Sequence, residues 1–456
     1  MDGLQMDVES GKRKWMYPLL RKGPLYKWRN WLSYVYLLLF FSSPFLRING
    51  QPVLLLNFID RQFVILGQVF WPQDIFLFML ASIAFIVSIV LFTIAFGRIF
   101  CGWICPQTIF MEMVFRKVEF WIEGDARDRK KLDAAPWDRE KIIKKTFKHL
   151  IFIVISFFIA NTFLAYIIGS DNLLKIVTEP ITRHWVGLLS IWVFTAVFYL
   201  VYSQVRELVC TVICPYGRLQ GVLIDEHTLV VAYDDVRGEP RGKLSRLETT
   251  SAVKGDCVDC GLCVDVCPTG IDIRKGTQLE CINCTACIDV CNEVMGKIHK
   301  PANLIGFFSE NMIREKEKPT FTGRMMGYSA VILVLVGVLS YFIISRSDLD
   351  VTIMRSPGML YQEQPDGYVS NMYSAEVINK TNHPKNITLT ADDPAIKIKY
   401  IQKPGTIAKE GSVKAMFFVL IPSKNIHTPK TMVNVQVIVN KQIVKTVSTA
   451  FVGPIN

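Results

Sequence analysis

The run Cys257-Val-Asp-Cys260-Gly-Leu-Cys263-Val-Asp-Val-Cys267-Pro268 is followed by a second run, Cys281-Ile-Asn-Cys284-Thr-Ala-Cys287-Ile-Asp-Val-Cys291. Both runs have the spacing C-x2-C-x2-C-x3-C. This spacing predicts that three thiolates of one loop wrap a [4Fe–4S] cluster, while the fourth cysteine of each run binds the other cluster. We therefore assign one cluster to Cys257, Cys260, Cys263 and Cys291 and the second to Cys281, Cys284, Cys287 and Cys267. A pair of zinc sites is the competing interpretation, but zinc sites pair C-x2-C knuckles at longer range.

The cysteines in the rest of the chain are also clustered. All 12 cysteines lie in short spaced motifs, which in a large chain is typical of metal sites rather than of a disulfide framework. The four outside the two runs form two copies of C-x3-C-P, each preceded by an arginine: Arg98…Cys101-Gly-Trp-Ile-Cys105-Pro106 and Arg206…Cys210-Thr-Val-Ile-Cys214-Pro215.

At positions i and i+4 of a helix, the two thiols of each copy are predicted to lie on one face. Soft thiolates at this spacing favour Cu(I). We therefore predict a metal-binding or redox role for Cys101, Cys105, Cys210 and Cys214. Convergence of all four on one metal, a dithiol redox pair, a third iron–sulfur site and inert buried thiols stay open as interpretations. Met111 and Met113 follow the first copy; core packing is the ordinary role of such methionines, and metal ligation is the alternative.

Five stretches are apolar enough to cross a membrane, since a span needs about 20 apolar residues. They cover roughly residues 31–46, 75–96, 150–168, 185–202 and 325–344. A mean hydropathy of +0.30 and a hydrophobic content of 51% agree with a membrane protein. Basic loops beside a bilayer then explain the net charge of +11 better than nucleic-acid binding does.

The basic residues also predict an orientation. Lysines and arginines concentrate before the first span and in the 97–149 loop, whereas the segments after the first and third spans contain few of them. The positive-inside rule places the N-terminus and the 97–149 loop in the cytoplasm. With five spans, residues 203–324 are cytoplasmic as well, and the tail from Ser345 lies outside.

The second and fourth spans each end in the same C-x3-C-P motif. Two helix pairs that close with one motif on one side of the membrane look like a parallel repeat. The two cysteine pairs are then expected to face each other near the cytoplasmic surface.

The C-terminal tail has a different pattern. Ile396-Lys-Ile-Lys-Tyr400 and Thr431-Met-Val-Asn-Val-Gln-Val-Ile-Val439 alternate between apolar and polar residues, which predicts half-buried strands. A domain of about 100 residues built from such strands suggests a β-sandwich of immunoglobulin type.

The predicted fold is thus a multi-domain membrane protein: a five-helix transmembrane region, a cytoplasmic two-cluster ferredoxin-like α+β insert and an extracytoplasmic immunoglobulin-like β-sandwich. Its parts are an N-terminal segment (1–30), four helices (31–209) with the 97–149 loop, a connector (210–250), the ferredoxin domain (251–300), a connector (301–324), a fifth helix (325–345) and the sandwich (346–456).

Taken together, these residues resemble the cytochrome c oxidase accessory family known as CcoG, FixG or RdxA, over nearly the whole chain. The resemblance rests on both cysteine runs and on Cys101-Gly-Trp-Ile-Cys105-Pro-Gln-Thr, Ile122-Glu-Gly-Asp125, Cys210-Thr-Val-Ile-Cys214-Pro-Tyr-Gly-Arg218, Tyr233-x3-Arg237-Gly-Glu-Pro-Arg241, Asn371-Met-Tyr373 and Asn379-Lys-Thr381. The one departure in the cysteine pattern is Asn292, where a second proline is usual; that proline is not a ligand.

The resemblance implies a protein of the bacterial cytoplasmic membrane that helps to assemble a cbb-type haem–copper cytochrome c oxidase. It implies that Cu(II) is reduced to Cu(I) by electrons from the two [4Fe–4S] clusters, with copper held by Cys101, Cys105, Cys210 and Cys214. It also implies an immunoglobulin-like C-terminal fold. The expected partners are the membrane, copper ions and assembly factors of the oxidase.

Two other functions compete with the cupric reductase. The first is a ferredoxin-type subunit of a respiratory oxidoreductase that takes electrons from a quinol. The second is a non-catalytic assembly scaffold whose outer β domain binds partners. The electron donor, cytoplasmic or quinol, is not identified by the sequence, and no G-x-G-x-x-G or P-loop supports a flavin or nucleotide site.

Overall fold

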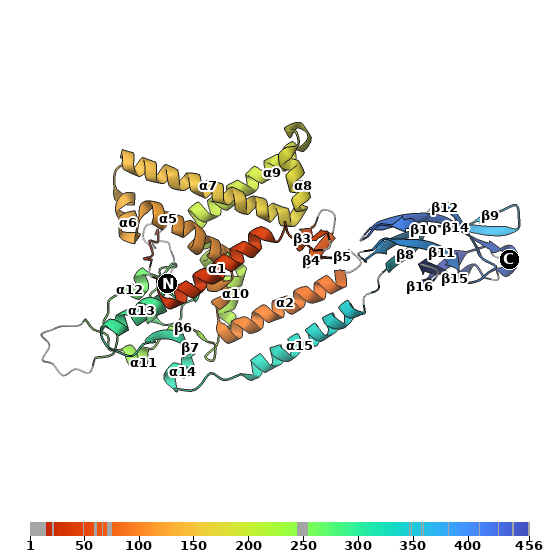
Figure 1. Ribbon diagram of the computed structural model, residues 1–456. Helices are drawn as coiled ribbons and strands as arrows, with labels where there is room; N and C mark the ends of the chain where they lie inside the picture. Colours follow the sequence, from red (N-terminus) through yellow and green to blue (C-terminus); the bar gives the residue numbers. More distant parts are fainter. Residues whose placement is uncertain are drawn as a thin grey trace. The chain divides into compact units, whose positions relative to one another are not determined.

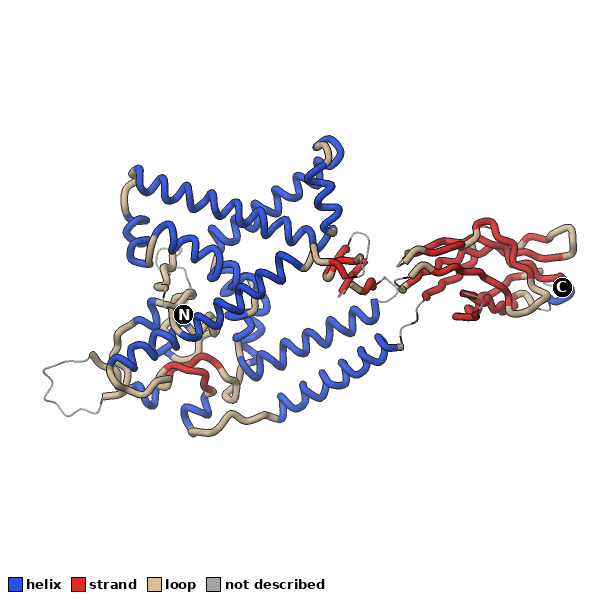
Figure 2. The backbone as a smooth tube through the Cα atoms, in the orientation of Figure 1, coloured by secondary structure: helices blue, strands red, loops and turns tan. Residues whose placement is uncertain are grey.

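The computed structural model describes residues 15–454 except 21, 49, 59–61, 66, 71–74, 244–253, 346, 348, 357, 359, 382, 410, 427, 440 and 441. Most of the predicted N-terminal segment 1–30 before residue 15, and the junction of the predicted connector and ferredoxin domain at 244–253, lie outside the described residues. The chain divides into two compact units, Met1–Leu339 and Ser340–Asn456. The first is mainly helical and the second mainly β-strand (Figures 1 and 2).

Four helices among the described residues are long and apolar enough to cross a membrane. They are α2 (Ile75–Phe96), α7 (Arg139–Ile168), α9 (Ile181–Leu200) and α15 (Gly323–Ile344), and they correspond to four of the five predicted spans. None of the most apolar window of α15 is buried inside the protein. A helix that is apolar all round and uncovered by protein requires lipid around it.

The helix α7 begins well before its predicted span at residue 150. The Asp138 side chain accepts a hydrogen bond from the Lys141 backbone N–H at 2.8 Å and so caps the helix at Arg139. Its basic first turns therefore extend the membrane helix beyond the apolar stretch.

The first predicted span corresponds to α1 (Pro24–Ser42), which is not among these four helices. Pro24 occupies its first turn, and it ends before Pro44 because proline cannot continue a helix. Lys27 and Arg29 consequently lie within the helix and make it more polar than the predicted stretch. A fifth span stays a prediction.

The other elements of the first unit are short. Strands β1 (Arg47–Ile48) and β2 (Gln51–Pro52) pair with each other, and β3 (Leu54–Asn57), β4 (Gln62–Ile65) and β5 (Gln68–Phe70) form a three-stranded sheet. The helices are α3 (Ile99–Trp103), α4 (Pro106–Thr108), the π-helix η2 (Ile109–Phe115), α5 (Arg116–Glu123), α6 (Ala126–Ala134), α8 (Ser170–Thr178), the π-helices η3 (Val201–Val205) and η4 (Val209–Ile213), α10 (Pro215–Leu223), α11 (Asp235–Gly238) and α14 (Glu310–Arg314).

The cysteine runs lie in an α+β region bracketed by two antiparallel strands, β6 (Val230–Tyr233) and β7 (Ile305–Phe308). Between them come α12 (Leu262–Asp265), the 3-10 turn η5 (Ile273–Lys275) and α13 (Ala286–Lys297). Their shared core includes Tyr233, Ile288, Met295 and Leu304. This is the ferredoxin-like arrangement that the spacing predicts, and it packs both runs against one core.

The second unit is a β-sandwich, as the alternation predicts. One sheet has the strand order β12-β14-β10-β8, with β9 paired to β10, and the other has the order β13-β11-β15-β16. The strands are β8 (Leu349–Arg355), β9 (Gln362–Glu363), β10 (Tyr368–Asn379), β11 (Lys385–Ala391), β12 (Lys397–Gln402), β13 (Gly405–Ile407), β14 (Ser412–Pro422), β15 (Lys430–Val439) and β16 (Gln442–Val452), with a 3-10 turn η6 (Ser423–Asn425).

Alternate residues of the two sheets fill one core between them. In β15, Val433, Val435 and Val437 are buried while Asn434 is exposed, which is the period-two pattern of a sheet with one covered face. Tyr373 is fully buried, and its hydroxyl donates to the Ala450 carbonyl at 2.8 Å, joining β10 of one sheet to β16 of the other.

Candidate iron–sulfur and thiol site

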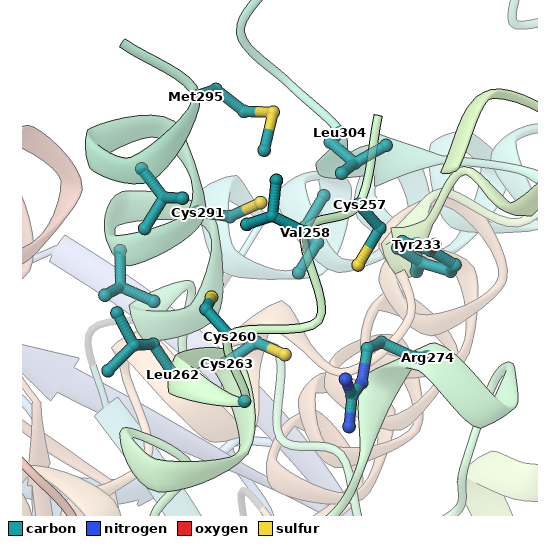
Figure 3. A pocket seen from close by; sticks show the side chains of 14 residues that line it. Tyr233, Cys257, Val258, Cys260, Leu262, Cys263, Arg274, Cys291, Met295 and Leu304 are labelled. Carbon is teal, nitrogen blue, oxygen red and sulfur yellow. The ribbon is translucent and has the colours of Figure 1, made fainter. Parts of the chain in front are cut away.

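The first cavity of the α+β region is lined by cysteines from both runs. Cys257, Cys260 and Cys263 come from the first run, and Cys291 comes from α13 in the second (Figure 3). Apolar side chains, among them Leu304, surround the four thiols. The structure thus brings together the four cysteines that the spacing assigns to one cluster, including the crossed fourth ligand.

The second cavity holds the other predicted set. It is lined by Cys267, Cys281, Cys284 and Cys287, and Cys263 lines both cavities. Four thiols around an apolar space are the donor set that a [4Fe–4S] cluster takes. Two such spaces with a common wall suit electron transfer from one cluster to the next.

The backbone repeats its conformation in the two runs. Asp259 and Gly261 have positive φ angles of 50° and 71°, and Asn283 and Thr285 have 52° and 66° at the equivalent positions. Left-handed residues in such turns aim backbone N–H groups into one concavity, which favours anionic groups. For the β-branched Thr285 this conformation is strained, which indicates that the loop is shaped for its site.

Arg274 is a charged residue of the first cavity that the cysteine spacing does not identify. Its guanidinium donates to Asp272 at 2.8 Å and lies 2.5 Å from Asp259. A cation held beside a cluster stabilises the more negative, reduced state. No signal in the sequence distinguishes Arg274 from other arginines, because its place depends on how the segment between the runs folds.

The two C-x3-C-P copies do not form the regular helix that was predicted across each of them. Cys101 lies in α3, but Cys105 is the N-cap of α4, and Pro106 begins that helix. Likewise Cys210 lies in the π-helix η4, and Cys214 caps α10. The proline begins a new helix in both copies because its fixed φ suits the first helical position.

The two copies nevertheless lie against each other. The Gln107 side chain donates to the Arg206 carbonyl at 3.4 Å, and the Cys101 thiol donates to Gln220 at 3.5 Å. Gln220 is fully buried, and it lies beyond the motif in α10, where no sequence pattern marks it. The two copies therefore meet in the fold as predicted, and their position at the cytoplasmic surface stays a prediction.

Burial and neighbouring thiols both act on the pKa values of these cysteines. Burial raises the pKa of Cys101 to about 11, and the neighbouring Cys105 adds to the rise. Burial raises the pKa of Cys210 to about 12, with further contributions from Cys105 and Cys101. A bound cation would reverse this penalty, because thiolates are the metal-binding form. Over the described residues, no three His, Cys, Asp or Glu side chains are placed to hold a single metal ion, so convergence on one metal stays a prediction.

The first C-x3-C-P copy is in backbone contact with the loop of the second cavity. A Cβ atom on Gly102 would lie 2.4 Å from the Ile282 carbonyl oxygen and 3.0 Å from the Cys284 nitrogen. The Trp103 indole donates to the Asn283 carbonyl at 3.3 Å. Only glycine allows this approach, so the residue between Cys101 and Trp103 sets the distance from the thiols to the cluster loop.

A third cavity lies between the second copy and both cysteine runs. It is lined by Cys210 and Met111, by Pro268 and Thr269, which directly follow Cys267, and by Ile282 of the second run. A thiol and a thioether therefore face a space that is bounded by the loop of a predicted cluster ligand.

A buried ion network holds the second copy in place. Glu119 lies 2.5 Å from the Arg206 guanidinium and 3.2 Å from that of Arg129, and Lys148 of α7 lies 2.9 Å from Glu123. Burial alone would raise the pKa of Glu119, but the charges of Arg206 and Lys148 outweigh it and lower the pKa to about 2. Glu119 thus stays ionised and ties α5 to the turn before Cys210.

We expect Glu119→Gln to destabilise the protein by about 3–5 kcal/mol, because it leaves buried arginines without their carboxylate. The folded pKa of about 2 lies below the ordinary value of 4.5. The stabilisation is therefore complete above pH 4.5 and is lost as the pH falls toward 2. Thermal unfolding between pH 3 and pH 7 measures both effects.

The matched control is Glu140→Gln, which removes an exposed carboxylate paired with Lys144 at 2.6 Å. Such solvent-screened surface pairs contribute little to stability. Equal losses of stability in the two variants would contradict a special role for the network.

Three protein-family models match the chain. A 4Fe–4S dicluster domain matches residues 205–310, a 4Fe–4S binding domain matches residues 77–125, and the IG-like fold at the C-terminal of FixG, putative oxidoreductase, matches residues 339–454. The chain is thus a multi-domain membrane protein with iron–sulfur ferredoxin domains and an immunoglobulin-like C-terminal domain.

Three bacterial proteins are similar in sequence to most of the chain. Protein RdxB of Cereibacter sphaeroides is 34% identical over 84% of this chain and 83% of its own length. Protein RdxA of the same organism is 35% identical over 81% and 80%, and the nitrogen fixation protein FixG of Rhizobium meliloti is 30% identical over 84% and 80%. Because these relatives are 30–35% identical over more than four-fifths of the chain, the chain belongs to the FixG/RdxA family of iron–sulfur electron-transfer membrane proteins.

Proposed function

We propose that this protein is a cupric reductase, which reduces Cu(II) to Cu(I) for the assembly of a cbb-type haem–copper cytochrome c oxidase. The observation that carries the proposal is the backbone contact at Gly102 between the first C-x3-C-P copy and the loop of the second cavity. Soft thiols that select Cu(I) thereby lie beside a site for electron storage.

The chain's own residues have separate tasks in this reaction. Cys257, Cys260, Cys263 and Cys291 would hold one [4Fe–4S] cluster, and Cys267, Cys281, Cys284 and Cys287 the other; such clusters supply reversible one-electron storage when bound. The apolar walls of both cavities exclude water, and the positive-φ loops would direct backbone N–H groups at a bound cluster and so tune its potential.

Copper is the substrate at the four remaining thiols. Cys101, Cys105, Cys210 and Cys214 capture the ion, Cu(II) gains one electron from the reduced protein, and Cu(I) is retained because thiolates prefer the softer ion. One electron is consumed for each copper ion, and each thiol that binds the ion releases its proton to solvent, because the thiolate is the ligand.

We also propose five spans, with α1 as the first. The Tyr26 backbone N–H near its start donates to Asp289 of α13 at 2.8 Å, and the Phe40 carbonyl near its end accepts from Tyr166 of α7 at 2.8 Å. Helix α1 thus runs from the ferredoxin region to the far end of α7. With five spans, the basic 97–149 loop and the ferredoxin region are cytoplasmic and the immunoglobulin-like domain is outside.

The test is anaerobic. The protein is reduced, Cu(II) is added, and cluster absorbance is followed together with a Cu(I)-specific chelator. We expect Cu(I) to form as the clusters become oxidised, with one copper for each electron, and expect the signal to vanish when Cys101, Cys105, Cys210 and Cys214 are all replaced by serine. Clusters that stay reduced in the presence of copper would refute the proposal in favour of a quinol-linked subunit.

Met111 offers a finer test, because it lines the cavity that Cys210 faces whereas Met113 does not, although both are buried. We expect Met111→Leu to weaken Cu(I) binding about tenfold, as is typical when a group next to a metal is lost. Met113→Leu is the matched control and should leave the affinity unchanged. Chelator competition measures both, and equal affinities in all three proteins would show that the thioether is not a ligand.

A second candidate function follows from the 4Fe–4S binding domain that matches residues 77–125, since Cys101 and Cys105 are the two cysteines of that stretch. In this alternative the four C-x3-C-P cysteines hold a third cluster. Iron per chain would then fall by roughly a third when these cysteines are replaced, whereas the copper proposal expects unchanged iron.

A further inference from the structure

A hollow of about 560 Å³ lies beside the first turns of α1, against α5. Its size is that of ligand pockets, which span roughly 300–1,000 Å³. The lining residues are three lysines, four aromatic residues, one leucine and one asparagine: Lys22, Lys27, Lys117, Tyr26, Trp31, Tyr34, Phe120, Leu20 and Asn30. No acidic residue is among the described residues that line it.

Among the described residues, the three lysines of the hollow form no ion pair, and the Asp289 carboxylate of neighbouring α13 accepts instead from the Leu25 and Tyr26 backbone N–H groups. Lys117 contacts the Asn30 side chain and lies 4.8 Å from the Tyr34 ring centroid, so its described partners are uncharged. The nearest carboxylates of η2 and α5 are engaged elsewhere: Glu112 with Arg116, and Glu119 with arginines of the ion network. The hollow therefore favours an anion.

The face of α1 that leads away from the hollow identifies the kind of anion. Lys27, Trp31, Tyr34 and Leu38 are spaced by four, three and four residues, which places them on one side of the helix. Trp31, Tyr34 and Leu38 are exposed. Along this side of the helix, a cation is followed by aromatic rings and then by an aliphatic side chain. A helix that enters a bilayer presents these groups in turn to the lipid phosphates, the interface and the acyl chains.

We propose that this hollow binds the phosphate headgroup of an anionic phospholipid, with an acyl chain along the exposed face of α1. The Leu25 and Tyr26 N–H groups of the same helical turn donate to Asp289 of α13, which also carries Cys287 and Cys291. A lipid held here would fasten the ferredoxin region to the membrane surface through α1. The site is independent of the copper chemistry.

The test uses the full chain in detergent, titrated with phosphatidylglycerol or phosphatidylcholine and measured by native mass spectrometry. We expect phosphatidylglycerol to bind preferentially. The triple variant Lys22→Gln, Lys27→Gln, Lys117→Gln should bind it roughly 100-fold more weakly, because each cation near the surface contributes about fivefold.

The control is Arg127→Gln, Lys130→Gln, Lys131→Gln, which removes as many charges from exposed positions of α6 and should bind like the unmodified protein. Retained cluster absorbance shows that both variants are folded. Equal binding of the two lipids, an equal loss in the control, or displacement of the lipid by millimolar inorganic phosphate alone would each overturn the proposal, the last by showing a site for free phosphate.

Discussion

Replacing Cys291 with alanine should remove the cluster of the first run and leave that of the second. Cys291 belongs to the second run in sequence but lines the cavity of Cys257, Cys260 and Cys263. The variant should lose roughly half of its iron, because one of the two clusters loses a thiolate of its four-cysteine ligand set. Iron analysis and low-temperature EPR of the reduced protein measure the result.

The crossed assignment also predicts which variants share the same remaining EPR signal. The EPR signal that remains in Cys291→Ala should match the signal that remains in Cys257→Ala. The signal in Cys267→Ala should match that in Cys281→Ala, since Cys267 and Cys281 line the second cavity. If Cys291→Ala instead resembled Cys281→Ala, each cluster would take its four ligands from a single run, and the crossed arrangement would be wrong.

Replacing Gly102 with alanine should uncouple the thiols from the clusters. The added Cβ would lie 2.4 Å from the Ile282 carbonyl oxygen, which is a backbone atom and cannot move away without the loop. We expect the copper-dependent oxidation of the clusters to slow by roughly tenfold or more, equivalent to about 1.4 kcal/mol in the barrier. Overpacking of this kind also costs about 1–3 kcal/mol of stability. Stopped-flow absorbance measures the rate.

Gly296→Ala is the matched control. Gly296 lies in α13 of the same region, and a Cβ there meets nothing within 4 Å, so the change should leave the rate unaltered and slightly favour the helix. Iron content should be unchanged in both variants. A Gly102→Ala protein with its full iron and an unaltered rate would show that electrons reach copper by another route.

Several features could be predicted from the sequence because they depend on residues that are close together in the chain. The spacing of the cysteine runs predicts which thiols share a cavity, since three of each set lie within one loop. Hydrophobic runs predict α2, α9 and α15 closely, and period-two alternation predicts β12 and β15. The start of α7 was missed because its first turns are basic and are made helical by the Asp138 cap rather than by apolar periodicity.

The component parts can be identified from local sequence alone: two four-thiol sets, two C-x3-C-P copies, apolar helices and a β-sandwich tail. The contacts between these parts follow only from the folded chain. Gly102 touches the backbone at Ile282, Gln220 reaches Cys101, and Glu119 binds Arg206. These pairs are far apart in the chain, and no local period or spacing encodes them. They depend on close packing of whole elements, in which one missing Cβ or one buried charge sets the distance between sites.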